Sequence, residues 1–208
     1  MSAPTLVMAT RNAGKVRELQ ELLQDSGVNL LSLADFPEIP EIPEDGATFQ
    51  ENAAIKARAV ARLTGQPALA DDSGLAVDAL GGAPGVFSAR YAQDLTAPNP
   101  PGDADNWHKL LADLRDIPWE QRTARFVCEI ALALPDGRLF TAHGECEGVI
   151  ALAPQGDHGF GYDPVFWVPA YSATMAQLGP AVKNQISHRA RALAACRDLL
   201  ASVLDELN

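Results

Sequence analysis

The stretch TLVMATRNAGKVRELQELL, residues 5–23, contains the strand-to-helix transition on which the fold is built. Its first five residues form a short apolar run, which predicts a buried strand. Beyond the polar loop that follows, Val16, Leu19 and Leu23 recur at the spacing of one helix face, and Gly27 is a suitable end for that helix. The loop therefore lies at a helix N-terminus, where backbone N–H groups attract anions.

Further strands and helices follow in alternation. Residues 28–33 and 67–70 are apolar runs that predict strands, and residues 106–114 have a helical pattern. Thr48 and Glu51 form a capping box, which predicts a helix that starts there and ends at Gly65. Its expected buried face consists of Phe49, Ala53, Val60 and Leu63. A final helix capped by Ser187 is expected to bury Leu193, Cys196, Leu200 and Leu204.

A hairpin interrupts this alternation. Residues 124–134 alternate in polarity, and the turn Pro135-Asp136-Gly137 leads into a second strand near Arg138. Helices between strands favour parallel pairing, whereas a hairpin requires antiparallel pairing. The sequence therefore predicts an α/β protein with a mixed sheet, in one domain or in one domain with two lobes that share a core.

Composition and charge limit the classes of partner. The net charge of the 208 residues is −11, which argues against a nucleic-acid partner and against an anionic membrane surface. No apolar run approaches the roughly 18 residues that span a bilayer, and residues 1–10 lack the features of a secretory signal. The three cysteines are an odd number without close pairing, so we expect reduced thiols in a cytoplasmic protein.

The polar loop after the first strand is the first candidate binding segment. Thr10, Asn12 and Lys15 add hydroxyl, amide and ammonium donors to the N–H groups of the helix start, which suits a phosphate tail. The segment is not a Walker A loop. An ordinary loop in which Asn12 caps the helix is the alternative interpretation.

Adjacent carboxylates form the second candidate. Asp71 and Asp72 repel each other, so a site that contains both usually offers a cation, and Mg²⁺ prefers carboxylate and phosphate oxygens. A carboxylate beside a metal ion can also take a proton from an attacking water. The alternative is a β-turn at the end of the strand, since Asp, Ser and Gly are common turn residues.

Three further groups of residues have less specific patterns. Lys56 shares a helix face with Asn52 and could reach a phosphate, although a solvated charged face is the more common explanation of this pattern. The segment of residues 159–164 combines glycines, which permit close approach of a ligand, with aromatic rings that could stack on a base. Lys183 and residues 187–189 precede or begin the last helix, where cations could bind carbonyl oxygens or phosphates.

The order of these segments along the chain is specific. It reads Thr10-x-Asn12-x-x-Lys15, Thr48-Phe49-x-Glu51-Asn52-Ala53-x-x-Lys56-Ala57, Ala70-Asp71-Asp72-Ser73-Gly74-Leu75, Gly82-Ala83-Pro84-Gly85-Val86-x-Ser88-Ala89-Arg90-Tyr91, Gly159-Phe160-Gly161-Tyr162-Asp163-Pro164 and Ser187-His188-Arg189. In this order the set resembles the Ham1/RdgB family of inosine triphosphate pyrophosphatases, also called XTP/dITP diphosphatases. The resemblance runs from about Leu6 to the final helix.

The resemblance implies a fold, a reaction and an assembly. The fold is a long, twisted mixed sheet flanked by helices, with residues 1–208 as a single domain whose two lobes surround a central groove. The reaction is the Mg²⁺-dependent hydrolysis of ITP, dITP and XTP to the nucleoside monophosphate and pyrophosphate. The protein is expected to be a homodimer. Two alternatives are a Maf-like pyrophosphatase for modified pyrimidine nucleotides and a nucleotide-binding module without activity.

The resemblance also implies roles for individual residues. Asp72 would be the general base and a metal ligand, and Glu44 the second metal-linked carboxylate, for which Glu41 or Asp45 could substitute. Ser73 would contact the nucleotide, and Lys56 would support the triphosphate. The expected triphosphate-binding residues are Thr10, Arg11, Asn12, Ala13, Gly14 and Lys15. The expected base pocket consists of Phe160, Gly161, Tyr162, Asp163, Lys183, His188 and Arg189.

Overall fold

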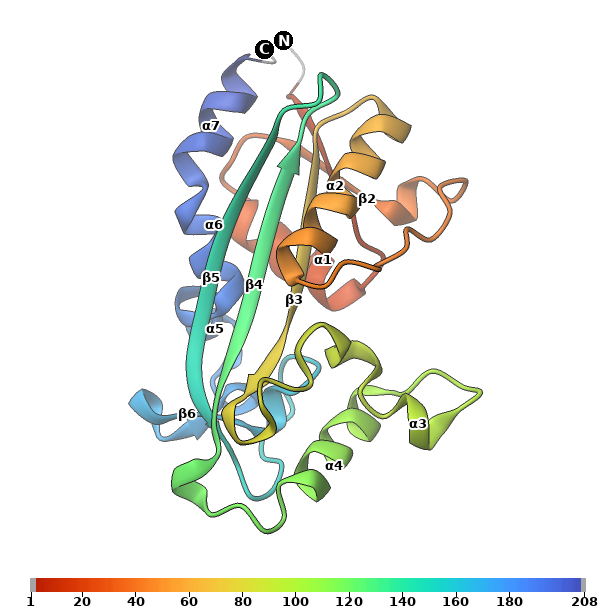
Figure 1. The fold of residues 1–208 in the computed structure, drawn as a ribbon. Coiled ribbons are helices and arrows are strands. Elements are labelled where there is room, and N and C mark those ends of the chain that lie inside the picture. The colour runs from red at the N-terminus through yellow and green to blue at the C-terminus, as the bar shows by residue number, and fades with distance from the viewer. Residues whose placement is uncertain (1–2, 207–208) are drawn as a thin grey trace. The chain divides into compact units, whose positions relative to one another are not determined.

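The computed structural model describes residues 3–206, apart from the side chains of residues 204 and 205. Its seven strands form one mixed sheet in the order β2-β1-β3-β4-β5-β6-β7 (Figure 1). The strands are β1 (Thr5–Met8), β2 (Asn29–Ser32), β3 (Ala68–Val77), β4 (Thr123–Ala133), β5 (Leu139–Ile150), β6 (Phe166–Val168) and β7 (Ala173–Thr174). The pairings of β1 with β2 and β3 are parallel, whereas β6 pairs antiparallel with both β5 and β7. The predicted mixed α/β fold is therefore confirmed.

The chain divides into two compact units. Unit 1 consists of Met1–Asp72, Cys128–Gly144 and Arg189–Asn208, and unit 2 of Ser73–Val127 and Glu145–His188. The helices of unit 1 are α1 (Ala13–Leu23), α2 (Phe49–Thr64) and α7 (Arg197–Glu206). Those of unit 2 are α3 (Gln93–Thr96), α4 (Asp103–Asp113) and α5 (Gly179–Ile186), and α6 (His188–Ala195) begins with the last residue of unit 2. Each unit is described by itself below.

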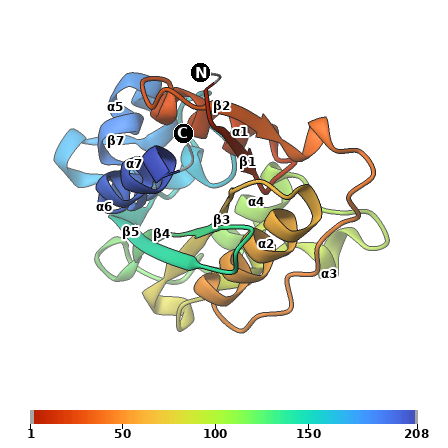
Figure 2. The same ribbon diagram turned by 90° about the horizontal axis from the view of Figure 1, so that it is seen from above.

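In unit 1, the alternation of side chains along β1 supplies two hydrophobic clusters. Leu6 and Met8 pack with residues of α1, α6 and α7, whereas Val7 packs with alanines and Val60 of α2. Figure 2 shows α2 on one side of strands β3 to β5 and α6 with α7 on the other. Unit 1 is therefore a sheet with helices on both faces, which explains why its strands are apolar on both sides.

Unit 2 has a core of its own. Leu75 and Val77 of β3 pack with Leu110 and Leu114 of the α4 region and with Phe166 of β6. Arg122 is 4 % exposed and donates from its guanidinium to the carbonyl oxygens of Leu114, Ile117 and Ala151. The bond to Leu114 satisfies the carbonyl of the C-cap residue of α4, and the bonds to Ile117 and Ala151 connect that end of the helix to the segments after α4 and β5.

Several local predictions are confirmed. Asn12 caps α1, Thr48 caps α2 by accepting from the N–H of Glu51, and Gly65 ends α2 in the left-handed conformation. The hairpin turn closes with a bond from the N–H of Leu134 to the carbonyl of Arg138. The three cysteines are free and buried, and no helix among the described residues is long and apolar enough to cross a membrane.

Other local predictions are wrong. The strand expected to stop at residue 70 continues to Val77 as β3, so Asp71 and Asp72 lie inside a strand and not in a turn. Leu63 is 52 % exposed, because Ala53, Ala57, Val60 and Ala61 form the buried stripe of α2 instead. Helix α1 ends at Leu23, before Gly27, and the expected final helix is divided into α6 and α7. Leu204 lies outside the described side chains.

Candidate active site

The loop before α1 has the cap that the sequence predicted. The Asn12 Oδ1 accepts from the N–H of Lys15 at 3.0 Å, and the Thr10 Oγ1 accepts from the N–H of Asn12 at 3.1 Å. Arg11 extends away from this cap and donates to the Ile39 carbonyl at 2.5 Å. Ala13 and Gly14 form the first turn of the helix. The cap gives the loop one defined conformation at a helix N-terminus, as an anion site requires.

Asp71 is the centre of a buried charge cluster in unit 1. Its side chain is inaccessible and accepts from Lys15 Nζ at 2.6 Å, from Arg189 Nε at 2.9 Å and from the Cys128 thiol at 2.9 Å. Burial alone would raise the pKa of Asp71, but Arg189 and Lys15 hold it well below its ordinary value. Burial, together with the Asp71 charge, raises the pKa of the Cys128 thiol well above its usual range, so Cys128 remains a neutral donor.

The side chain of Asp72 contacts a different set of residues. Its Oδ1 lies 2.7 Å from Lys56 Nζ, and the same ammonium lies 2.8 Å from Glu44 Oε1. Burial raises the pKa of Asp72 even though Lys56 opposes the shift. Burial would lower the pKa of Lys56, but Asp72 and Glu44 together raise it. One ammonium group therefore lies between the two carboxylates that were expected to bind the metal ion.

Asn52 fixes the loop that carries Glu44. Asn52 is 1 % exposed, and its Oδ1 accepts from the N–H of Gly46 at 2.8 Å. A Cβ at Gly46 would lie 2.8 Å from this oxygen, so the close approach of the loop to α2 requires a glycine there. The shared face of Asn52 and Lys56 is thus a buried face and not a solvated one.

The two lysines converge on one backbone oxygen. Lys56 Nζ donates to the Asp71 carbonyl at 3.0 Å, and Lys15 Nζ lies 3.3 Å from the same oxygen. Lys15 lies in the first turn of α1 and Lys56 in α2, so β3 is where the two positive charges meet. Two ammonium groups beside a capped helix N-terminus form a site for a polyanion.

The carboxylates at this position fit a magnesium ion. Mg²⁺ typically takes one or two protein carboxylates and completes its octahedron with water and substrate phosphates. Glu44 and Asp72 already share a cationic partner, Lys56, and the Glu44 side chain is 36 % exposed. Two carboxylates of this kind could be the protein ligands of a Mg²⁺ ion that takes its remaining ligands from water and phosphate.

Unit 2 contains a second polar cluster. Lys183 of α5 forms an ion pair with Asp163, and its Nζ lies 4.9 Å from the centroid of the Phe160 ring. The Asp163 Oδ2 also accepts from the N–H of Phe160 at 3.0 Å. A Cβ at Gly159 would lie 1.9 Å from this carboxylate, and Gly159 has a φ of +78°, so both space and conformation require glycine.

Four other predicted residues of unit 2 have different surroundings. The imidazole of His188 is buried and stacks on Phe126 at a centroid distance of 4.9 Å. Tyr162 is 5 % exposed, and its hydroxyl donates to the Ser88 carbonyl at 2.8 Å. Gly161 donates its N–H to the Asp103 carboxylate at 2.7 Å. Ser73 lies in β3, directly after Asp72.

Arg189, which the resemblance places in the base pocket, contacts buried carboxylates of unit 1. It belongs to unit 1, is 1 % exposed, and uses each of its three guanidinium nitrogens as a donor. Nε and Nη2 donate to Asp71 at 2.9 and 3.2 Å, and Nη1 donates to Glu18. Its contacts are those of a counter-ion for buried carboxylates.

Sequence reasoning missed the partners that complete both clusters. Glu18 and Cys128 were not candidates, and neither was Asp103, which receives the N–H of Gly161. Their partners are distant in sequence: Glu18 is 171 positions from Arg189, and Cys128 is 57 positions from Asp71. The one local signal was the pair of adjacent carboxylates, which already indicated that Asp71 needs cationic neighbours.

Comparisons with known proteins agree on one family. The model of the Ham1 family matches residues 6–199. A Geobacter sulfurreducens protein named dITP/XTP pyrophosphatase is 54 % identical over 195 residues, which are 94 % of this chain and 96 % of that protein. A protein of the same name from Nitratidesulfovibrio vulgaris is 55 % identical over 196 residues, covering 93 % of this chain and 94 % of that one.

Solved structures show the same fold. The structure of a HAM1 protein from Coxiella burnetii has a TM-score of 0.82 and 45 % identity, and covers 98 % of this chain and 99 % of that one. A structure described as nucleoside-triphosphatase / dITP/XTP pyrophosphatase from Mycobacterium abscessus has a TM-score of 0.73 and 48 % identity, with 92 % and 97 % coverage. The chain belongs to the Ham1 family.

Proposed function

We propose that this protein hydrolyses nucleoside triphosphates with non-standard purine bases, namely ITP, dITP and XTP, to the nucleoside monophosphate and pyrophosphate. The observation that carries the proposal is the convergence of Lys15 and Lys56 on the carbonyl of Asp71, with Asp72 bonded to Lys56. This arrangement combines binding groups for a polyphosphate with one carboxylate that can accept a proton. The relatives named dITP/XTP pyrophosphatase support the same reaction.

In the proposed mechanism, the residues of unit 1 bind the triphosphate and activate the attacking water. The loop Thr10–Lys15 and Lys56 bind the triphosphate, and their charges stabilise the departing pyrophosphate. Asp72 accepts the proton of the water that attacks the α-phosphorus, and the bond from phosphorus to the bridging oxygen breaks. Asp71 keeps Lys15 in position. Mg²⁺, held by Asp72 and Glu44, would neutralise phosphate charge and lower the pKa of bound water.

The residues of unit 2 are proposed to bind the base. Phe160 offers a ring for stacking, and Lys183 offers an ammonium donor beside it. Hypoxanthine and xanthine have a 6-keto oxygen that accepts such a donor, whereas the 6-amino group of adenine cannot. A donor that faces an amino group remains unpaired, which costs about 1–3 kcal/mol for a buried group. The pocket therefore favours ITP and XTP over ATP.

Three further properties belong to this proposal. The metal ion is Mg²⁺, the protein is a homodimer, and it acts in the cytoplasm, where three buried free thiols remain reduced. Light scattering coupled to gel filtration tests the dimer, with a monomer mass of 22.1 kDa as the contrary result. Neither the Maf-like alternative nor the module without activity is supported by the family or by the relatives.

A pyrophosphate-release assay across ITP, XTP, dUTP, GTP and ATP tests the function. With Mg²⁺ present, we expect pyrophosphate from ITP and XTP at rates well above those for ATP and dUTP. Excess EDTA should abolish the reaction, and added Mg²⁺ should restore it. Release of orthophosphate in place of pyrophosphate, or equal rates on all five substrates, would refute the proposal.

A further inference from the structure

Residues 159–163 form a bent segment that needs external support. Gly159 and Gly161 have φ values of +78° and +63°, conformations that residues other than glycine rarely adopt. Within the segment, the N–H of Phe160 bonds to Asp163, and outside it the N–H of Gly161 bonds to Asp103 of α4. Phe160 and Asp163 can only present a fixed surface to a ligand if this bend is held in place.

The side chain of Tyr162 anchors this bend to another part of unit 2. It is 5 % exposed and belongs to the hydrophobic cluster of unit 2, together with Leu75 and Phe166. Its hydroxyl donates to the carbonyl of Ser88 at 2.8 Å, across 74 positions of sequence. A buried side chain with a bonded hydroxyl is an anchor and not a surface that a base could contact.

Ser88 continues the connection to β3. It is 7 % exposed, its Oγ donates to the Gly85 carbonyl at 2.6 Å, and the same oxygen accepts from the N–H of Leu75 at 2.9 Å. Leu75 follows Asp72 by three positions in β3. Two hydrogen bonds to one buried residue therefore join the segment of residues 159–163 to the strand that carries Asp72.

We propose that Tyr162 and Ser88 are positioning residues, which hold the segment of residues 159–163 in register with β3 and thereby set the preference for the base. The inference rests on the proposed function, because it assigns base binding to Phe160, Asp163 and Lys183. Neither residue touches the substrate in this proposal. Their loss should loosen the base-binding segment, so discrimination between bases falls more than the rate of the chemical step.

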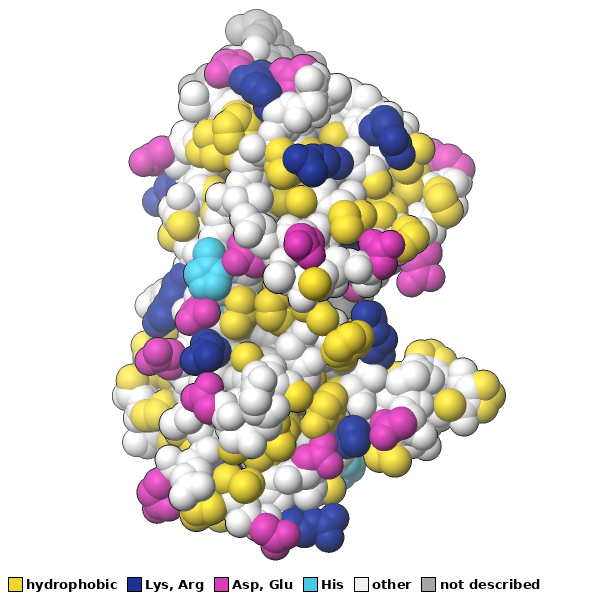
Figure 3. All heavy atoms as spheres, in the orientation of Figure 1, with side chains coloured by type: hydrophobic (Ala, Val, Ile, Leu, Met, Phe, Trp, Pro, Cys, Tyr) yellow, Lys and Arg dark blue, Asp and Glu magenta, His cyan; other side chains and the backbone are white. Residues whose placement is uncertain are grey.

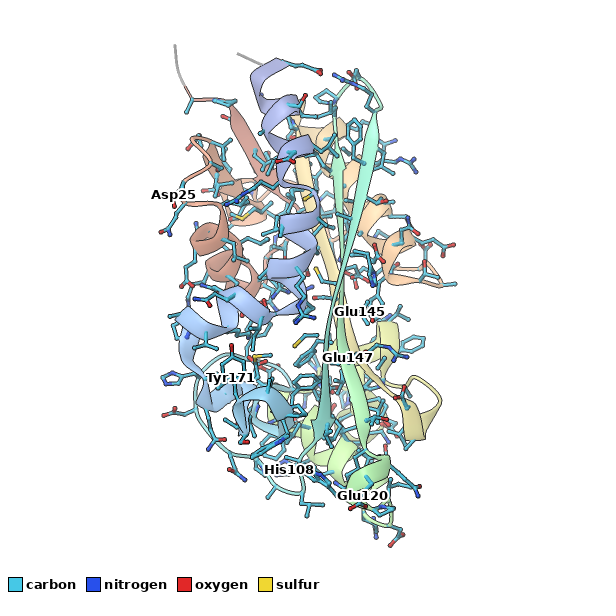
Figure 4. All side chains as sticks on the ribbon, turned by 90° about the vertical axis from the view of Figure 1, so that its left-hand side faces the viewer. Asp25, His108, Glu120, Glu145, Glu147 and Tyr171 are labelled. Atoms are coloured by element: carbon cyan, nitrogen blue, oxygen red, sulfur yellow. The ribbon has the colours of Figure 1, made fainter. Side chains whose placement is uncertain are left out.

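Two variants test the connection from its two ends. Tyr162→Phe removes only the hydroxyl, and Ser88→Ala removes the acceptor of the Leu75 N–H. In each variant we expect the kcat/KM ratio of ITP to ATP to fall by about fivefold, the equivalent of one buried hydrogen bond, mainly through a higher KM for ITP. Ser88→Thr keeps a hydroxyl and should restore the ratio. Tyr171, which is 44 % exposed and labelled in Figure 4, provides the control Tyr171→Phe, with an unchanged ratio.

A second measurement does not depend on activity. Hydrogen exchange followed by mass spectrometry should show faster exchange in peptides that cover residues 159–163 in Tyr162→Phe, but not in Tyr171→Phe. Unchanged exchange would overturn the proposal. Faster exchange or a lower melting temperature with an unchanged ITP/ATP ratio would also overturn it, because that result describes a merely structural role. If the wild type releases no pyrophosphate from ITP, the proposed function fails, while the exchange result still decides whether Tyr162 anchors the segment.

Discussion

The two candidate sites are built from different kinds of side chain. The cluster in unit 1 consists of charged groups: two carboxylates in β3 face two lysines and an arginine. The cluster in unit 2 has one principal ion pair, between Asp163 and Lys183, beside the ring of Phe160. The first type of site suits phosphates and a metal ion, and the second suits a flat heterocycle with a few polar edges.

Within unit 1, burial has different effects on the pKa values of two neighbouring aspartates. In unit 1, Asp71 is fully buried but its pKa is lowered, because cations outweigh the desolvation that would raise it. Asp72 is also buried, but there desolvation prevails and its pKa is raised. Neighbouring residues of one strand thus have opposite shifts, as expected for a permanent counter-ion beside a group that exchanges protons. On the face shown in Figure 3, acidic and basic side chains are interspersed.

The largest expected effect is that of replacing Arg189, and it tests whether this residue recognises the base. Arg189→Met removes the guanidinium that pairs with the buried carboxylates of Asp71 and Glu18, so the free energy of unfolding should fall by about 3–5 kcal/mol. Because the guanidinium contacts carboxylates of unit 1, both ITP and ATP hydrolysis should suffer by the same factor. Urea unfolding and kcat/KM for both substrates measure this, with Arg17→Met on the exposed face of α1 as the control. A collapse of the ITP/ATP ratio would instead restore Arg189 as a reader of the base.

The second prediction tests Asp72, the proposed general base in the charge cluster of unit 1. Asp72→Asn keeps the shape of the side chain but removes the proton acceptor and a metal ligand, so kcat should fall at least about a hundredfold. The fold should be retained, which circular dichroism can verify. Asp136→Asn, at the exposed hairpin turn, should keep wild-type turnover. Turnover of Asp72→Asn near the wild-type value would exclude Asp72 as the base.

The third prediction tests the aromatic cluster. Lys183→Met removes the ammonium beside Phe160, so kcat/KM for ITP should fall by about tenfold through loss of a charge-assisted hydrogen bond. ATP hydrolysis and the Mg²⁺ concentration for half-maximal activity should barely change, since the metal site belongs to unit 1. Lys109→Met in α4 is the matched control. Equal losses on ITP and ATP would show that Lys183 does not recognise the base.

The smallest expected effect is the dependence of kcat/KM on pH, which should be set by the ionisation of Asp72 and Lys56 in unit 1. Asp72 must be ionised to accept a proton, and its raised pKa means that activity declines at a higher pH than for an ordinary aspartate. Lys56 must stay charged, and its raised pKa retains that charge in alkaline solution. We therefore expect kcat/KM at saturating Mg²⁺ to rise by a few-fold above neutral pH and to be greatest near about pH 9 to 10. A maximum near pH 5 would contradict this assignment.

The sequence by itself determined the local structure and the candidate residues. Asn12, Thr48 and Gly65 were identifiable because a helix cap depends on neighbours within a few positions. The mixed sheet followed from the hairpin signal together with the alternation of strands and helices. Asp72, Lys56 and Glu44 were predicted together from the resemblance, and in the structure all three are in contact.

Only the tertiary structure decided which charges are paired. The adjacent aspartates suggested a turn by local propensity, but burial between partners keeps them inside β3. Arg189 and His188 are adjacent in sequence, yet one bonds to Asp71 and Glu18 in unit 1 while the other stacks on Phe126 in unit 2. Local patterns contain no information about such partners, because the free energy of a buried charge depends on groups that are distant along the chain.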